Sequence, residues 1–379
     1  MIARRTLLAN GIGGIAAGML IPRVVYAAAP TERRFVFIIQ RGAADGLHIV
    51  PPLGDPGYAQ LRAPFLETLS NAHRVDATFS LHPALSRVAG LFDARQAMAV
   101  HATASVYRDR SHFDGQNVLE TGGRHAYTET IGWMNRLVGV LPSDKGLALA
   151  TDIPMALRGP AAVTSYAPTR LPASGADLMD RVGALYADDP QLAGLWHTAL
   201  STQAMVGSAV RDNGRSGEAI GRIAAQLLAP NEGARIMMIE TDGWDTHSAQ
   251  IGRLNTQLRN LDALVGALAD GLGAAWNQTL VVVATEFGRT AALNGTGGTD
   301  HGTASALLLI GGALHDGGRV IADWPGLAPS HLYQGRDLRP TSATEAVIVG
   351  ALARHFDQDA DLMARTVYPD QPDLKPQMA

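Results

Sequence analysis

The chain reads RIMMIETDGWDTH from Arg235 to His247, TLVVVATEFGRT from Thr279 to Thr290, and GTDHGTASALLLI from Gly298 to Ile310. In each run an apolar stretch, typical of a buried strand, adjoins a polar stretch. These polar stretches hold four acids and two histidines, namely Asp242, Asp245, His247, Glu286, Asp300 and His301. Because an open α/β sheet binds its ligands at strand ends, this pattern predicts a metal or anion site at one edge of a sheet.

The order of these runs predicts how their strands pair. Ser248–Leu272 carries apolar residues every three or four positions, which is typical of a helix with one buried face. Strand, helix and strand make a βαβ unit, so we expect the two flanking strands to be parallel neighbours. Between Glu286 and His301 there is only a loop rich in Gly, Thr and Asn. The strand Ala304–Ile310 is therefore expected to run antiparallel and to bring His301 to the acids of the other two runs.

Further elements extend this α/β pattern toward both ends of the chain. Phe35–Gln40 and Ala97–His101 are apolar strand candidates, and Asp45 lies in the small-residue loop after the first of them. Ser111–Glu120 predicts a helix with Ser111 at its N-cap, and Ser342–Phe356 predicts another helix.

The segment 151–231 differs from the rest of the chain. Turns marked by Pro and Gly come first, and alanine-rich stretches with apolar residues at helical spacing follow at Leu178–Ala187, Pro190–Ala209 and Ala219–Leu228. We interpret this segment as a helical insertion or cap within a single domain that covers residues 30–379.

Composition limits the kinds of protein and site that are possible. The chain has 379 residues, of which 46% are hydrophobic and 17% are charged, and this suits a globular protein with a sizeable core. The net charge of −4 and the lack of a basic stripe give no reason to expect binding to nucleic acid. Without cysteine there are no disulfides, thiolate ligands or thiol nucleophiles. Any metal must therefore bind oxygen and imidazole ligands.

Residues 1–29 are typical of an export signal rather than of the fold. Arg4 and Arg5 precede an apolar run rich in Gly and Ala, and small residues follow near position 29. The paired arginines favour the twin-arginine route and a periplasmic or secreted protein; an ordinary secretory signal or an uncleaved anchor is the alternative. No later stretch is long and apolar enough to span a bilayer, so no stable membrane span is expected after the signal is removed.

The clearest candidates for metal ligands lie within six residues of one loop. Carboxylates and imidazole at Asp242, Asp245 and His247 would suit zinc, manganese, magnesium or calcium. The simpler alternative is that Asp242 makes an Asx turn and Asp245 caps the following helix.

Each of the other polar candidates has two possible interpretations. Glu286 is either a ligand or the partner of Arg289, and Asp45 is either a further carboxylate ligand or a loop cap. His301, next to Asp300, is either a ligand or a hydrogen-bonded turn histidine.

Nucleophile and anion-binding candidates gather at the start of the Ser111–Glu120 helix. Ser111 is placed to act as a nucleophile activated by a metal, although plain N-capping is the commoner use of serine. His112 could serve as a ligand or a general base. Arg110 and Arg289 could clamp an anion, although a solvated or ion-paired arginine is the default for either.

Five motifs together resemble a known family. They are RGAADG at 41–46, SHF at 111–113, DGWDTH at 242–247, EFGRT at 286–290 and GTDHGT at 298–303. These motifs are similar to those of domain-of-unknown-function family 1501, and the resemblance runs from about Arg33 to Phe356. It implies a bacterial protein with a twin-arginine signal in the alkaline phosphatase and sulfatase-like superfamily. It also implies an α/β fold with a large mixed, mostly parallel sheet between helices and the active site at one sheet edge.

The resemblance also implies roles for residues at matching positions. Asp45 matches a first-strand carboxylate that binds metal, and Ser111 or His112 falls where a nucleophile sits at a helix start. The 242–247 motif resembles an Asp and His metal pair, and His301 resembles a late metal histidine. Phosphatases of the superfamily carry Asp-His where this chain has Glu286-Phe287, so one histidine of the usual two-metal set is missing.

The sequence therefore supports two main hypotheses. The first is an exported, metal-dependent hydrolase that acts on a phosphate or sulfate ester of a small molecule or polymer. It predicts that Ser111→Ala and His301→Ala each abolish turnover. The alternative, which Phe287 favours, is a non-catalytic binding protein on the same fold. A metal-dependent isomerase or transferase is a third reading.

Overall fold

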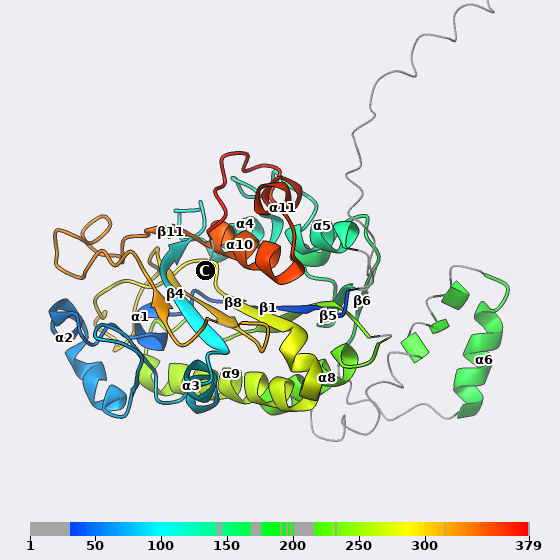
Figure 1. Cartoon of the computed structure of the whole chain (residues 1–379), viewed down its shortest axis with the longest axis horizontal. Helices are drawn as coiled ribbons and strands as arrows, with labels where there is room; N and C mark the ends of the chain where they lie inside the picture. Colours follow the sequence, from blue (N-terminus) through cyan, green and yellow to red (C-terminus); the bar gives the residue numbers. More distant parts are fainter. Residues whose placement is uncertain are drawn as a thin grey trace, which may run out of the picture.

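In this computed structural model, the described residues are 31–141, 146–167, 176–189, 192–194, 196–197, 199–200, 216–231, 233–314 and 316–377. The expected signal segment 1–29 and most of the expected helix Pro190–Ala209 lie outside the described residues. One large mixed sheet lies between two layers of helices (Figure 1). None of the described helices is long and apolar enough to cross a membrane.

The main sheet is mostly parallel. Its order is β10 (Val320–Ile321), β4 (Ala97–Ala104), β9 (Ser305–Ile310), β8 (Thr279–Ala284), β1 (Arg34–Gln40), β7 (Ile236–Thr241), β5 (Gly146–Leu149) and β6 (Val163–Ser165). β11 (Ser342–Ala343) pairs with the end of β4, and β2 (His73–Arg74) and β3 (Ser80–Leu81) form a separate pair. Among the described strands of this sheet, only β9 runs antiparallel to its neighbours, as predicted from the absence of a crossover helix before it.

One expected pairing is wrong. β7 and β8 were expected to be neighbours across their βαβ unit, but β1 lies between them and pairs in parallel with both. The reason lies in β1 itself. All seven of its residues are buried, so this strand needs a place where both faces and both edges are covered.

Helices cover both faces of the sheet, and β1 alternates between them. Val36 and Ile38 pack in the core beneath α3 (Ser86–Asp93), α8 (Gly217–Leu228) and α9 (Gln250–Leu272), which line one face in Figure 1. Phe35, Phe37 and Ile39 pack in the core beneath α5 (Trp133–Val140), α10 (Thr344–Phe356) and α11 (Ala360–Val367) on the other. This alternation is the period of two that a buried strand requires.

The remaining helices are α1 (Gly46–Ile49), α2 (Pro56–Arg62), η1 (Ala63–Leu69), α4 (His112–Thr121), η2 (Met155–Leu157), α6 (Ala176–Tyr186) and η4 (Gly273–Gln278). Two expected helices of the segment 151–231 are present as α6 and α8. The segment is not wholly a cap, however, because β6 belongs to the main sheet and α8 packs with α9 in its core.

The topology gathers the expected site loops at one sheet edge. β1, β7 and β8 are parallel, so the loops after them meet where the antiparallel β9 begins. α4 follows β4 and brings its first turn to the same edge (Figure 1). The sheet therefore assembles residues from four distant parts of the sequence.

We expect Glu345→Gln to remove a pH-dependent loss of stability. Glu345 is fully buried in α10, and burial raises the pKa of its carboxyl to about 7 from the ordinary 4.5. The folded state therefore favours the proton. The penalty is absent below about pH 4.5 and grows until about pH 7, to about 3 kcal/mol. The unfolding free energy of the variant minus that of the parent should rise over this interval in denaturant titrations. A flat difference would contradict the prediction.

Candidate metal centre

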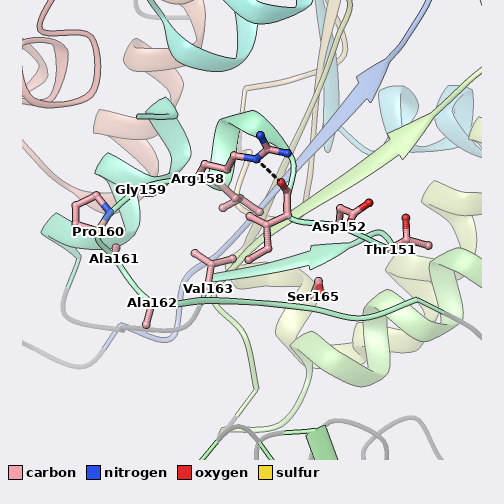
Figure 2. A pocket seen from close by; sticks show the side chains of 11 residues that line it. Thr151, Asp152, Arg158, Gly159, Pro160, Ala161, Ala162, Val163 and Ser165 are labelled. Atoms are coloured by element: carbon pink, nitrogen blue, oxygen red, sulfur yellow. Dashed lines mark hydrogen bonds between the residues drawn. The ribbon is translucent and has the colours of Figure 1, made fainter. Parts of the chain in front are cut away.

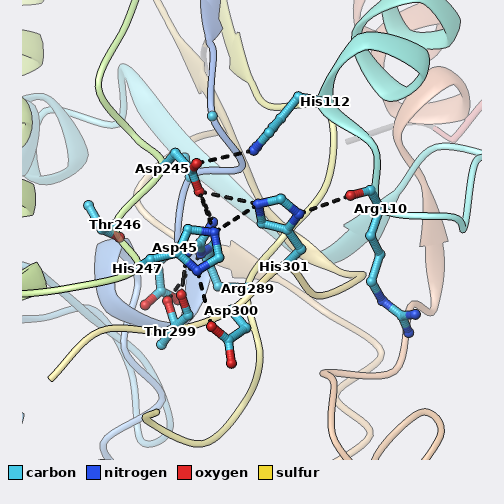
Figure 3. Close-up of polar contacts among 12 residues, drawn as sticks. Asp45, Arg110, His112, Asp245, Thr246, His247, Arg289, Thr299, Asp300 and His301 are labelled. Atoms are coloured by element: carbon cyan, nitrogen blue, oxygen red, sulfur yellow. Dashed lines mark hydrogen bonds and ion pairs between the residues drawn. The ribbon is translucent and has the colours of Figure 1, made fainter. Parts of the chain in front are cut away.

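Four side chains, from two loops and the start of α4, meet at the sheet edge (Figure 3). His112, Asp245 and His301 each offer a ligand atom, and these atoms all lie within 4.8 Å of one another. His247 Nε2 lies 3.1 Å from Asp245 Oδ1 and 3.0 Å from His301 Nε2. We call these four residues the histidine cluster.

Each imidazole of the histidine cluster has an acceptor at Nδ1. The partners are Glu286 Oε1 for His112 at 2.8 Å, Asp300 Oδ1 for His247 at 3.0 Å, and the Arg110 carbonyl for His301 at 2.9 Å. An acceptor there fixes the proton on Nδ1 and leaves a lone pair on Nε2 of the neutral ring. All three Nε2 atoms lie close to Asp245, and His112 Nε2 is buried without a hydrogen-bond partner.

The arrangement of these lone pairs indicates whether the site can hold a cation. Two Nε2 lone pairs 3.0 Å apart, beside a carboxylate, repel one another unless a proton or a cation lies between them. Metal-bound histidines usually donate their other N–H to a carboxylate or a carbonyl, and all three histidines here do so. The residues present therefore fit a divalent metal.

Glu286 orients His112 rather than joining the cluster. Its carboxylate is buried and also accepts hydrogen bonds from Gly42 N at 2.9 Å and Gln116 Nε2 at 3.1 Å. Burial alone would raise the pKa of Glu286, but the His112 hydrogen bond and these donors hold it below its ordinary value. The same hydrogen bond raises the pKa of His112.

Arg289 is not an open anion clamp. Its guanidinium is buried, with Nη1 2.6 Å from Asp245 Oδ1 and Nε 3.1 Å from Thr299 Oγ1. Burial would raise the pKa of Asp245, and the hydrogen bond and charge of Arg289 outweigh it and lower the pKa. Arg289 therefore keeps Asp245 ionised and oriented.

Two expected ligands lie away from the cluster. Asp45 is buried and forms an ion pair with Arg62, whose Nη1 lies 2.5 Å from Asp45 Oδ2. Burial would raise the pKa of Asp45, but the Arg62 cation lowers it overall. The described ion pairs place all three histidines of the cluster beside Asp245 and none of them beside Asp45. Asp242 is exposed, and the described contacts give it no ion pair.

Ser111 takes the N-cap position of α4, as the sequence predicted, but its hydroxyl does not cap the helix. The backbone N–H of Ser111 donates to the Tyr107 hydroxyl at 3.1 Å. Among the described residues, no hydrogen bond joins Ser111 to the histidine cluster. Its role as a nucleophile stays a prediction.

Asp300 and His247 form the exposed side of the centre. Asp300 accepts hydrogen bonds from Asn294 Nδ2 at 3.0 Å and from the ring of His247. These two donors lower the pKa of Asp300, the asparagine contributing most. Asp300 therefore orients His247 as Glu286 orients His112.

Phe287 supports the centre by packing. Its ring stacks on His112, with centroids 5.1 Å apart and planes at 24°, and it also lies against Gly115 of α4. A β-carbon at position 115 would come within 3.0 Å of the Phe287 ring, so the glycine allows this close approach. The aromatic residue at 287 thus holds His112 in place, a role that no sequence pattern marks.

A separate cavity of about 690 Å³ lies beyond β5 and β6 (Figure 2). Thr151, Asp152, Arg158 and Ser165 are its polar lining, and Arg158 Nε donates to the Ile153 carbonyl. Among the described residues of this lining, Asp152 is the only acid and there is no histidine.

Comparison with known proteins gives a family and distant structural likenesses. The family model described as "Protein of unknown function (DUF1501)" matches residues 32–365 of this chain. No curated protein matches the sequence. The C-terminal periplasmic domain of EcEptC from Escherichia coli aligns at 8% identity and a TM-score of 0.38, over 74% of this chain and 73% of that one.

Two other solved structures align at a similar level. Lipoteichoic acid synthase LtaP from Listeria monocytogenes has 10% identity and a TM-score of 0.38, over 78% of this chain and 70% of that one. The phosphonate monoester hydrolase of Agrobacterium radiobacter has 11% identity and a TM-score of 0.35, over 76% and 70%. These likenesses are too distant to assign a function to this chain.

Proposed function

The chain belongs to the DUF1501 family of proteins of unknown function, and we propose that it is a metal-dependent hydrolase of phosphate or sulfate esters. One observation carries the proposal: the Nε2 atoms of three histidines lie 3.1 to 3.4 Å from the Asp245 carboxylate, and each ring has an acceptor at Nδ1. Three nitrogen donors and one oxygen donor suit zinc or manganese better than magnesium or calcium, which prefer oxygen ligands.

In the proposed reaction the metal and the protein groups would have different roles. A divalent cation held by His112, His247, His301 and Asp245 would polarise an ester oxygen and lower the pKa of a nearby water. The first-turn amides of α4 would bind the other oxygens of the anion, because the Ser111 hydroxyl does not cap them. Arg289 would hold Asp245 ionised through the reaction.

The test is a hydrolysis screen of the purified chain, loaded in turn with zinc, manganese, magnesium and calcium. Aryl phosphates, aryl sulfates and a phosphodiester separate the ester classes. We expect turnover of at least one class, lost on chelation and restored by the metal. Stoichiometric metal without turnover of any ester would favour the binding-protein alternative.

The sequence predicted that Ser111→Ala abolishes turnover, but we now expect this variant to lower turnover by less than about tenfold. The reason is that, among the described residues, no hydrogen bond joins the Ser111 hydroxyl to the histidine cluster, so a metal-activated water is the better nucleophile. Steady-state kinetics on the best ester would measure the effect. Complete loss of turnover in a variant that still binds metal would make Ser111 the nucleophile instead.

We also propose export by the twin-arginine route, on the pattern of Arg4, Arg5 and the apolar run that follows. Fractionation of cells that express the full chain, with an Arg4→Lys and Arg5→Lys double variant as control, would test it. Export of the double variant at the parent level would favour an ordinary secretory signal.

A further inference from the structure

The buried carboxylate of Asp337 is connected to the histidine cluster through two arginines. Asp337 lies in the loop between β10 and β11 and is fully buried. It forms isolated β-bridges with Thr290 and Tyr333, so its backbone is fixed from two sides. Its side chain binds two arginines, Arg110 and Arg336, and each of these arginines contacts His301.

The first arginine holds the ring of His301. Asp337 Oδ2 accepts from Arg110 Nε at 3.0 Å and from Nη2 at 2.7 Å. Arg110 has a φ of +60°, a left-handed conformation that a non-glycine residue keeps only when its surroundings fix it. In that conformation the Arg110 carbonyl accepts from His301 Nδ1 at 2.9 Å. The ion pair thus maintains the backbone turn that fixes the His301 tautomer.

The second arginine holds the backbone of His301. Arg336 Nε lies 3.0 Å from Asp337 Oδ1, and Arg336 Nη2 donates to the His301 carbonyl at 2.5 Å. Thr303, two residues further on, donates from Oγ1 to Asp337 Oδ2 at 2.8 Å. The carboxylate is therefore connected to the ring and the main chain of one candidate ligand and to the loop that leads from it into β9.

We propose that Asp337 is the positioning residue of the metal centre and fixes the orientation and tautomer of His301 through Arg110 and Arg336. The inference rests on the proposed metal centre but not on any ester as substrate. Loss of the carboxylate charge would free Arg110 from its left-handed turn. The His301 ring would then lose the acceptor that keeps its Nε2 free of a proton.

Asp337→Asn keeps the shape of the side chain and removes its charge. Calorimetric titration with zinc chloride alone should give a weaker affinity than that of the parent. The upper limit is about 10- to 100-fold, the range for complete loss of a direct outer partner such as the Arg110 carbonyl. In the metal-free protein, ¹⁵N chemical shifts of the His301 ring at fixed pH should change from one tautomer to a mixture. A purely structural role would move neither the affinity of the folded protein nor the tautomer.

Asp262→Asn is the matched control. Asp262 is also buried and accepts from Arg87 N at 3.0 Å and Val88 N at 2.9 Å, at the start of α3. Its loss should destabilise the fold and leave zinc affinity unchanged. Parent-like zinc binding and a single His301 tautomer in Asp337→Asn would overturn the inference, as would an equal loss of affinity in both variants. Failure to hydrolyse any ester would leave these two readouts unchanged and would count only against the proposed activity.

Discussion

His301→Ala is expected to remove stoichiometric metal from the protein and, with it, all metal-dependent turnover. His301 Nε2 lies 3.0 Å from His247 Nε2 and 3.3 Å from Asp245 Oδ1, so its loss opens one side of the cluster. Losing an outer partner of a ligand already weakens metal binding about 10- to 100-fold, and losing the ligand itself should cost more. Metal content by mass spectrometry of the purified chain, beside zinc titration, would measure the effect. His112→Ala should behave in the same way.

Two control variants sharpen this result. His125→Ala removes an exposed histidine outside the cluster, and Asp242→Ala removes the exposed acid of the same loop as Asp245. Both should keep metal at the parent level. Loss of metal in Asp242→Ala would return that acid to the ligand set. Full metal content in His301→Ala and His112→Ala would mean that the cluster is not the metal site.

The sheet could largely be predicted from the sequence because its strands are buried on both faces. Phe35–Gln40, Thr279–Ala284 and Ala304–Ile310 are apolar runs that hardly suit any other element, and they became β1, β8 and β9 with ends shifted by at most one residue. Strand order was harder. A βαβ unit fixes direction and handedness, but nothing local in the sequence says that a distant strand such as β1 enters between its two strands.

The site was predictable as a region but not as a set of contacts. The loops that end the parallel strands had to meet, and the antiparallel β9 brought His301 to Asp245. Which of Asp242 and Asp245 is the candidate ligand depends on one turn of the backbone, and the pattern of residue types does not predict that turn. Asp242 points to solvent, and Asp245 pairs with Arg289.

The partners of the candidate ligands were the hardest to predict because they come from far away in the chain. Glu286 reaches His112 across 174 residues, and Asp337 reaches Arg110 across 227 residues. Such pairs depend on tertiary packing, and neither hydrophobic periodicity nor local sequence motifs predict them. Phe287 is the clearest case. The sequence indicated only that a metal ligand is missing at this position, whereas in the structure its ring packs on His112.

Arg62→Met should be among the most destabilising single changes in the chain, at about 3–5 kcal/mol, because it leaves the Asp45 charge buried and unpaired. Arg62 is fully buried, lies 2.5 Å from Asp45, and also donates to the carbonyls of Ala291 and Thr290 at 2.9 and 2.8 Å. Denaturant unfolding followed by circular dichroism would measure the loss. A decrease below about 1 kcal/mol would mean that the ion pair is not held as described.

The double variant Asp45→Asn with Arg62→Met separates charge from packing. Both charges are gone, so part of the lost stability should return, although the two carbonyls remain without their donors. The same variant tests the expectation that Asp45 binds metal. If the Arg62 cation takes the place that a metal would have at this carboxylate, the folded double variant keeps the metal of the parent. Loss of the metal from a folded double variant would make Asp45 a ligand and would reopen a site with two metals.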